Sequence, residues 1–206
     1  IYTLSLHDAL PISATAAPAA DATGPLVGAS PAFRAIWSQL RRVALTDTPV
    51  LLCGETGTGK DTLARALHGH GARAAGPFVA VPCAALRPDP ADALARHVES
   101  AAAGTLYLDD IDALPPLLQA ELVHAIDRGP GPRLVAASRH DLLQGTGSER
   151  LTPALLHRLG VFPVYVPPLR ERRDDLLLLM RHFLEVHLAR QGKRVPGFTE
   201  RATAAL

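Results

Sequence analysis

Short apolar runs alternate with amphipathic stretches along most of the chain. The runs are predominantly apolar rather than alternating, which is typical of strands in a parallel sheet whose two faces are both covered. They are residues 49–53, 78–81, 104–108, 133–137 and 162–166. We expect each run to form one buried strand.

The amphipathic stretches predict helices between and around these strands. Ser30 can cap a helix that has Pro31 at its first position and extends to about Ala44. The other predicted helices are residues 62–67, 89–101, 117–127, 153–159 and 174–190. Strands that alternate with helices predict an α/β fold, with a parallel sheet and helices on both faces.

A glycine-rich segment between the first strand and its helix carries the clearest chemistry. Residues 54–61 read Gly-Glu-Thr-Gly-Thr-Gly-Lys-Asp, a phosphate loop in all but its last residue. Glycines let backbone N–H groups surround phosphate oxygens, and the following helix adds its positive end. Lys60 would reach the outer phosphates. The alternative is a glycine-rich turn before a helix that binds no ligand.

Asp61 departs from the usual pattern of such a loop. The usual residue is Ser or Thr, whose hydroxyl binds Mg²⁺. A carboxylate also binds Mg²⁺, but it brings negative charge close to the phosphates. Thr62 lies one residue too late to replace the hydroxyl in the same geometry.

Acidic residues follow the third predicted strand. Residues 105–110 read Thr-Leu-Tyr-Leu-Asp-Asp, so the two acids stand at the carboxyl end, where ligands bind in parallel sheets. After a phosphate loop this is a Walker B pattern. Asp109 is expected to hold Mg²⁺ directly or through water, and Asp110 to polarise the attacking water.

Composition narrows the function classes. The formal net charge is +1 in 206 residues, so charge alone shows no nucleic-acid-binding surface. No apolar run approaches the 18 residues or so of a membrane span. Cys53 and Cys83 lie in apolar contexts, which favours buried thiols over a disulfide.

The first residues do not share the pattern of the rest. Residues 1–13 match a translation of sequencing-adapter DNA, and we interpret them as an assembly artefact; the alternative is a disordered tail. Residues 14–23 are an Ala- and Pro-rich linker. We expect an α/β nucleotide-binding subdomain at 24–168 and part of a helical lid at 169–206. The last residues resemble an interrupted helix, which suggests a fragment.

The motifs together resemble the AAA+ domain of bacterial enhancer-binding proteins, which act on sigma-54 RNA polymerase. The matching segments are residues 26–30, 54–61, 76–81, 83–86, 104–110, 114–115, 158–159, 161–163 and 167–175. The resemblance covers residues 24–206. It implies a cytoplasmic protein that binds ATP and Mg²⁺ at subunit interfaces of a hexameric or heptameric ring. It also implies that DNA is bound only through a domain absent from this chain.

The resemblance assigns residues to roles. Those expected to bind nucleotide are Val27, Gly28, Gly54, Glu55, Thr56, Gly57, Thr58, Gly59, Lys60, Asp61 and Thr62. Those expected in catalysis are Asp109, Asp110 and Arg158, of which Arg158 would reach a neighbour's ATP. Those expected to bind Mg²⁺ are Asp61 and Asp109.

Several positions depart from the family pattern. Pro82 replaces a switch Asn, Asp110 replaces a longer Glu, and Arg139 replaces a sensor Asn. Of the family's two arginines that reach a neighbour's ATP, the first aligns with Thr152. Because positioning dominates phosphoryl transfer, these changes predict weakened hydrolysis, and Arg139 favours retention of a phosphate over turnover.

The loop that contacts sigma-54 in this family, GAFTGA, belongs between Leu86 and Gly104. Residues 87–103 contain no such motif. We therefore expect an ATP-binding regulator module without sigma-54 contact. One alternative is an active ATPase that remodels sigma-54 RNA polymerase to activate transcription. Another is a structural remnant that binds no nucleotide.

Overall fold

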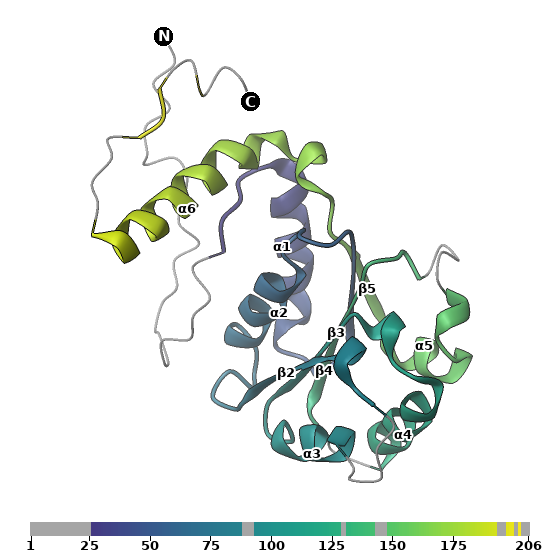
Figure 1. Cartoon of the computed structure of the whole chain (residues 1–206). Helices are drawn as coiled ribbons and strands as arrows, with labels where there is room; N and C mark the ends of the chain where they lie inside the picture. Colours follow the sequence, from purple (N-terminus) through teal and green to yellow (C-terminus); the bar gives the residue numbers. More distant parts are fainter. Residues whose placement is uncertain are drawn as a thin grey trace. The chain divides into compact units, whose positions relative to one another are not determined.

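The computed structural model describes residues 26–87, 93–128, 131–142, 148–192, 197–199 and 202 (Figure 1). The predictions for residues 1–13 and 14–23 lie outside the described residues. The chain divides into two compact units. One is Ile36–Pro168, and the other joins the described residues before Ile36 to the described residues from Leu169 onward.

The unit Ile36–Pro168 is built on five strands. They are β1 (Val50–Cys53), β2 (Phe78–Pro82), β3 (Thr105–Asp109), β4 (Arg133–Ser138) and β5 (Phe162–Tyr165). Their order in the sheet is β2-β3-β4-β1-β5, and every pairing is parallel. The predicted parallel sheet is therefore confirmed, with each expected strand within one residue of its predicted bounds.

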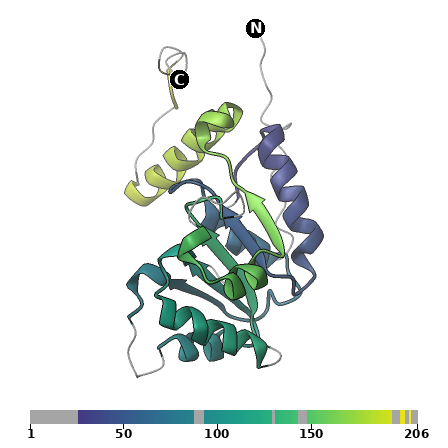
Figure 2. The ribbon, with the colours of Figure 1, turned by 90° about the vertical axis from the view of Figure 1, so that its right-hand side faces the viewer.

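Helices cover both faces of this sheet. They are α1 (Pro31–Ala44), α2 (Lys60–Gly69), α3 (Ala93–Ser100), α4 (Pro116–Asp127) and α5 (Pro153–Leu159). In Figure 1, α2 lies on one side of the strands and α3, α4 and α5 on the other. Helices α3 and α4 contact each other and lie side by side in Figure 2. The helices expected at residues 117–127 and 153–159 are confirmed.

Alternate strand residues supply two apolar layers. Leu51, Leu106 and Leu108 belong to the cluster that includes Leu94 of α3 and Leu122 of α4. The intervening strand residues face α2, where the side chains of Leu63, Ala64 and Leu67 are buried. Such a layered core fixes the strand ends relative to one another, which is the requirement for a site built from several of them.

The second unit contains the start of α1 and the helix α6 (Leu176–Gln191). Ser30 Oγ accepts a hydrogen bond from Phe33 N at 3.1 Å, which confirms the predicted cap. The buried carboxylate of Asp175 accepts hydrogen bonds from Ala29 N, Ser30 N and Ser30 Oγ at 2.6, 2.7 and 2.8 Å. Helix α6 begins two residues later than predicted, because residues 173–175 form a separate helical turn.

Candidate functional site

The strand order brings three loop segments to one edge of the sheet. Strand β4 lies between β3 and β1, so the residues after β4 stand between the acids after β3 and the loop after β1. Gly54 N donates a hydrogen bond to Ser138 O at 3.1 Å, which ties the glycine-rich loop to the end of β4. The candidate site is this carboxyl edge.

The glycine-rich loop has a backbone that side chains rarely permit. Gly57 and Gly59 have φ angles of 83° and 93°, in the left-handed region that favours glycine. A Cβ at Gly54 would lie 2.5 Å from Val166 O, so only glycine fits there without a shift. The Thr58 hydroxyl donates to Glu55 O at 2.8 Å and braces the turn. Thr56 is exposed and Thr62 half-buried on the first turn of α2.

Lys60 is buried and folds back over the loop. Its ammonium donates to Gly54 O at 2.7 Å and to Glu55 O at 2.9 Å. Burial lowers the pKa of Lys60, while the nearby carboxylates of Asp110 and Asp109 act in the opposite direction. A buried cation near a glycine-rich turn at a helix start is the chemistry that binds phosphate.

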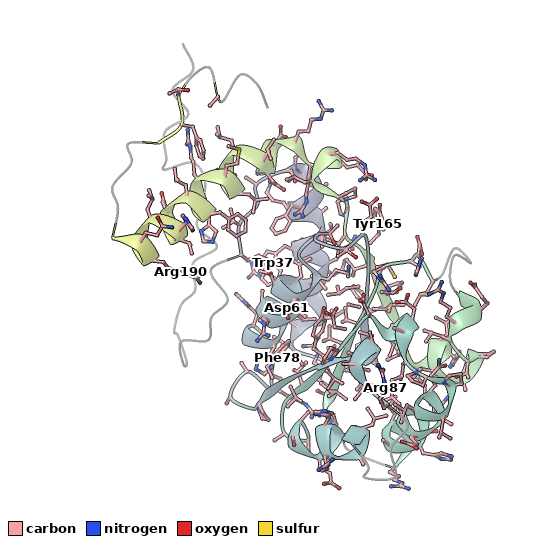
Figure 3. The ribbon with its side chains drawn as sticks, in the orientation of Figure 1. Trp37, Asp61, Phe78, Arg87, Tyr165 and Arg190 are labelled. Atoms are coloured by element: carbon pink, nitrogen blue, oxygen red, sulfur yellow. The ribbon has the colours of Figure 1, made fainter. Side chains whose placement is uncertain are left out.

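The Asp61 side chain points along α2 toward Arg65. Its two carboxylate oxygens lie 3.2 and 3.1 Å from Arg65 Nε, a pairing of residues one helical turn apart. The Arg65 guanidinium also stacks 4.6 Å from the centre of the Phe78 ring. Figure 3 labels Asp61 and Phe78, which lie on the side of the sheet covered by α2. To bind Mg²⁺, Asp61 would have to leave Arg65.

The two acids after β3 have different surroundings. Asp109 Oδ1 accepts a hydrogen bond from the Tyr107 hydroxyl at 3.0 Å. Burial, the charge of Asp109 and this hydrogen bond raise the pKa of Tyr107, so the phenol remains a donor. Asp110 has φ 51°, the only positive φ of a non-glycine among the described residues, and pairs with Arg139 Nε at 3.4 Å. Strained backbone of this kind concentrates at functional sites.

A second pair lies beside the first, and the sequence pattern alone does not single it out. Asp112 Oδ2 lies 2.8 Å from Nδ1 of His140. The Asp112 side chain is fully buried, and its other oxygen has no hydrogen-bond partner among the described residues. The sequence signal that could have identified Asp112 is an acidic residue three positions after Asp109, at the same strand end.

The remaining expected residues lie elsewhere. Arg158, on α5, binds Asp127 at the end of α4 through two contacts of 2.8 and 2.6 Å. Val27 and Gly28 belong to the unit that contains α6, where Gly28 packs directly on the Phe33 ring.

These residues fit a nucleoside triphosphate with Mg²⁺. Residues 54–62 could supply backbone donors, a cation and a helix start, and Asp109 could supply an oxygen ligand at the same edge. Among the described residues, no three His, Cys, Asp or Glu side chains form a metal cluster of their own. No helix in the described part of the chain is long and apolar enough to cross a membrane.

Comparisons with known proteins agree with this geometry. Residues 27–169 match the family model described as the Sigma-54 interaction domain. The chain is 36% identical over 207 residues to the transcriptional regulatory protein XylR of Pseudomonas putida, covering 87% of this chain and 37% of XylR. The chain thus spans well under half the length of this curated relative.

Solved structures share the fold. NtrX from Brucella abortus, crystallised with ATP, superposes with a TM-score of 0.71 at 30% identity, over 84% of this chain and 46% of NtrX. The P-loop NTPase domain of a sigma-54 transport activator from E. coli gives a TM-score of 0.57 at 29% identity, over 69% of this chain and 99% of that domain. These likenesses confirm the expected P-loop AAA+ fold.

Proposed function

Because this chain belongs to the Sigma-54 interaction domain family, we propose that it is the ATP-binding AAA+ module of a bacterial regulator of that type. The observation that carries the proposal is Lys60, buried and held against the carbonyls of a loop whose glycines have left-handed backbone. ATP or ADP would bind through residues 54–62, with Mg²⁺ held at Asp109. The bound ion would neutralise charge on the phosphates.

Weak hydrolysis is the second part of the proposal. Asp110 is one methylene shorter than the usual glutamate, and its carboxylate is already paired with Arg139. A carboxylate held in this way is poorly placed to polarise water. Arg139 would favour phosphate retention, since a guanidinium binds phosphate oxygens in a planar, two-point arrangement.

The third part concerns partners. Ring assembly would place Arg158 near the ATP of a neighbouring copy. To reach that ATP, Arg158 would have to leave Asp127. Contact with sigma-54 is not expected, because residues 87–103 lack the contact loop and α3 leads through one short turn into β3. Any DNA contact would come from a domain outside this chain.

An active remodelling ATPase is the second candidate, favoured by the family match itself. It predicts turnover that rises steeply with protein concentration, as copies supply Arg158 to each other. The proposed retention module predicts slow turnover at every concentration. Single-turnover hydrolysis measured across a concentration series separates the two.

Calorimetric titration with Mg²⁺-ATP and Mg²⁺-ADP tests the binding site. Lys60→Ala is expected to weaken binding at least about tenfold, since hydrogen bonds to a charged group contribute roughly 1.5–3 kcal/mol. Arg41→Ala, on the exposed side of α1, is the control and should bind like the wild type. Equal affinity of the wild type and Lys60→Ala would exclude this loop as the nucleotide site.

A further inference from the structure

Two side-chain pairs join the turn after β3 to the turn after β4. Asp110 lies 3.4 Å from Arg139, and Asp112 lies 2.8 Å from His140. Acids two residues apart on one turn thus meet consecutive basic residues on the other. The turns are connected at two neighbouring points rather than one.

The two pairs differ in burial. The Asp112 side chain is fully enclosed, whereas the Asp110 and Arg139 side chains are 33% and 45% exposed. Removing the partner of a buried carboxylate is strongly unfavourable, so the inner pair is a permanent connection. The outer, solvent-screened pair is weak, and Arg139 can exchange Asp110 for another anion.

The backbone around Arg139 is fixed on both sides. His140 N donates to Ser138 Oγ at 3.0 Å, and Ser138 O accepts from Gly54 N at 3.1 Å. His140 is in turn held by Asp112. Arg139 therefore projects from a short segment attached to the phosphate loop at one end and to the buried acid at the other.

We propose that Asp112 and His140 are positioning residues that set the preference of this site for ATP over ADP. By fixing the segment that bears Arg139, they keep its guanidinium at Asp110, where the terminal phosphate of ATP can compete for it. ADP lacks that phosphate and leaves the Arg139 pair intact. This inference rests on the proposed binding of nucleotide at residues 54–62.

Affinities for Mg²⁺-ATP and Mg²⁺-ADP, measured by calorimetry, test the inference without relying on hydrolysis. The variants are Asp112→Asn, which keeps the shape, and His140→Phe, which keeps the ring. Each should lower the ATP-to-ADP affinity ratio about threefold, the scale of a partly exposed ion pair, with ADP affinity unchanged. In an Arg139→Ala background neither should change the ratio further.

The Nε signal of Arg139 in ¹⁵N NMR spectra provides a readout without nucleotide. It should shift in both variants, as the guanidinium leaves Asp110. Asp112→Asn removes the buried charge and His140→Phe removes its partner, so either variant tests the inference if the other fails to fold. Thermal unfolding identifies that failure.

Different outcomes separate this inference from the proposed function. If the variants lose ATP and ADP affinity equally, Asp112 and His140 have only a structural role and the inference is overturned. The same holds if they lower the ATP-to-ADP affinity ratio as much in the Arg139→Ala background as in the wild type. An unchanged ratio in folded variants that bind nucleotide would overturn it while leaving the proposed function in place. A wild type that binds neither nucleotide would overturn the proposed function, and the inference with it.

Discussion

The backbone, length and pairing of Asp110 all bear on whether this site could hydrolyse ATP. Its backbone has φ 51° and ψ 54°, a left-handed conformation that Asp tolerates better than most residues. Its side chain is shorter than a glutamate and is paired with Arg139. The short side chain and the pairing with Arg139 both limit how well this carboxylate could polarise water.

Lengthening this side chain should raise ATP turnover modestly. Asp110→Glu restores reach, but Pro82 and Arg139 remain, so we expect a gain well below the roughly 10²-fold that a 1 Å displacement can cost. Steady-state phosphate release measures the gain, with Asp110→Asn as the control that keeps the length and removes the charge. A wild-type rate at or above about 1 s⁻¹ would contradict the premise of weak hydrolysis.

His68 makes stability depend on pH. Burial lowers its pKa below the ordinary 6.5, and its Nδ1 lies 2.9 Å from the Thr105 hydroxyl. As pH falls below about 6.5, the unfolded chain takes up a proton that the folded chain does not, so the free energy of unfolding decreases. Below the folded-state pKa this contribution is fully lost.

Denaturant unfolding at pH 7.5 and 5.5 measures how much His68 contributes to the loss of stability at low pH. His68→Asn should reduce the loss of stability between the two pH values, because one proton-linked group is removed. His124→Asn, at an exposed position of α4, reports the effect of removing an imidazole from the surface. An identical pH dependence in the wild type and His68→Asn would show that His68 does not contribute.

At the scale of elements, α1 is held by a residue far away in the sequence. Arg133, at the start of β4, donates to Ala44 O at 2.7 Å and Val43 O at 2.8 Å. These are carbonyls of the last turn of α1, where cations are favourable. The same side chain is only 2% exposed, so the helix end is capped inside the protein.

Replacing this cap should destabilise the domain. Arg133→Met keeps the aliphatic stem but leaves two carbonyls without their charged donor, and we expect a loss of about 2 kcal/mol. Arg41→Met on the exposed side of α1 should change the free energy of unfolding by less than about 0.5 kcal/mol. Urea unfolding measures the free energy of unfolding of both variants. Similar losses in Arg133→Met and Arg41→Met would mean that Arg133 is not a significant cap.

At the scale of the whole molecule, the sheet order assembles the site. Strands β1, β3 and β4 are separated in the sequence but adjacent in the sheet, so their carboxyl ends meet. Helix α3 ends at Ser100, and Gly104 N then donates to Ala101 O at 2.7 Å, which closes a tight turn directly before β3.

Sigma-54 should not be trapped by this chain. A protruding contact loop needs flanking helices and a mobile tip, and residues 87–103 are too few to provide them. A pull-down with sigma-54 and an ATP transition-state analogue measures the contact. A chain with a full GAFTGA loop inserted between Leu86 and Gly104 is the positive control. Specific trapping of the chain without the insertion would contradict the prediction.

The sequence by itself determined the parallel α/β fold, the glycine-rich turn between β1 and α2, and the position of the acids after β3. Local patterns are sufficient there: buried strands read as apolar runs, and a turn with left-handed backbone favours glycines at set positions. Ser30 likewise identified the start of α1, because a cap acts within one turn of the chain.

Only the tertiary structure decided which charges meet. Asp110 pairs with Arg139, and Asp112 is buried against His140. Both pairings depend on β3 and β4 being neighbours, which no local pattern specifies. The physical reason is that burial and distance determine the electrostatic environment of an ionisable group, and both are set by residues remote in the sequence.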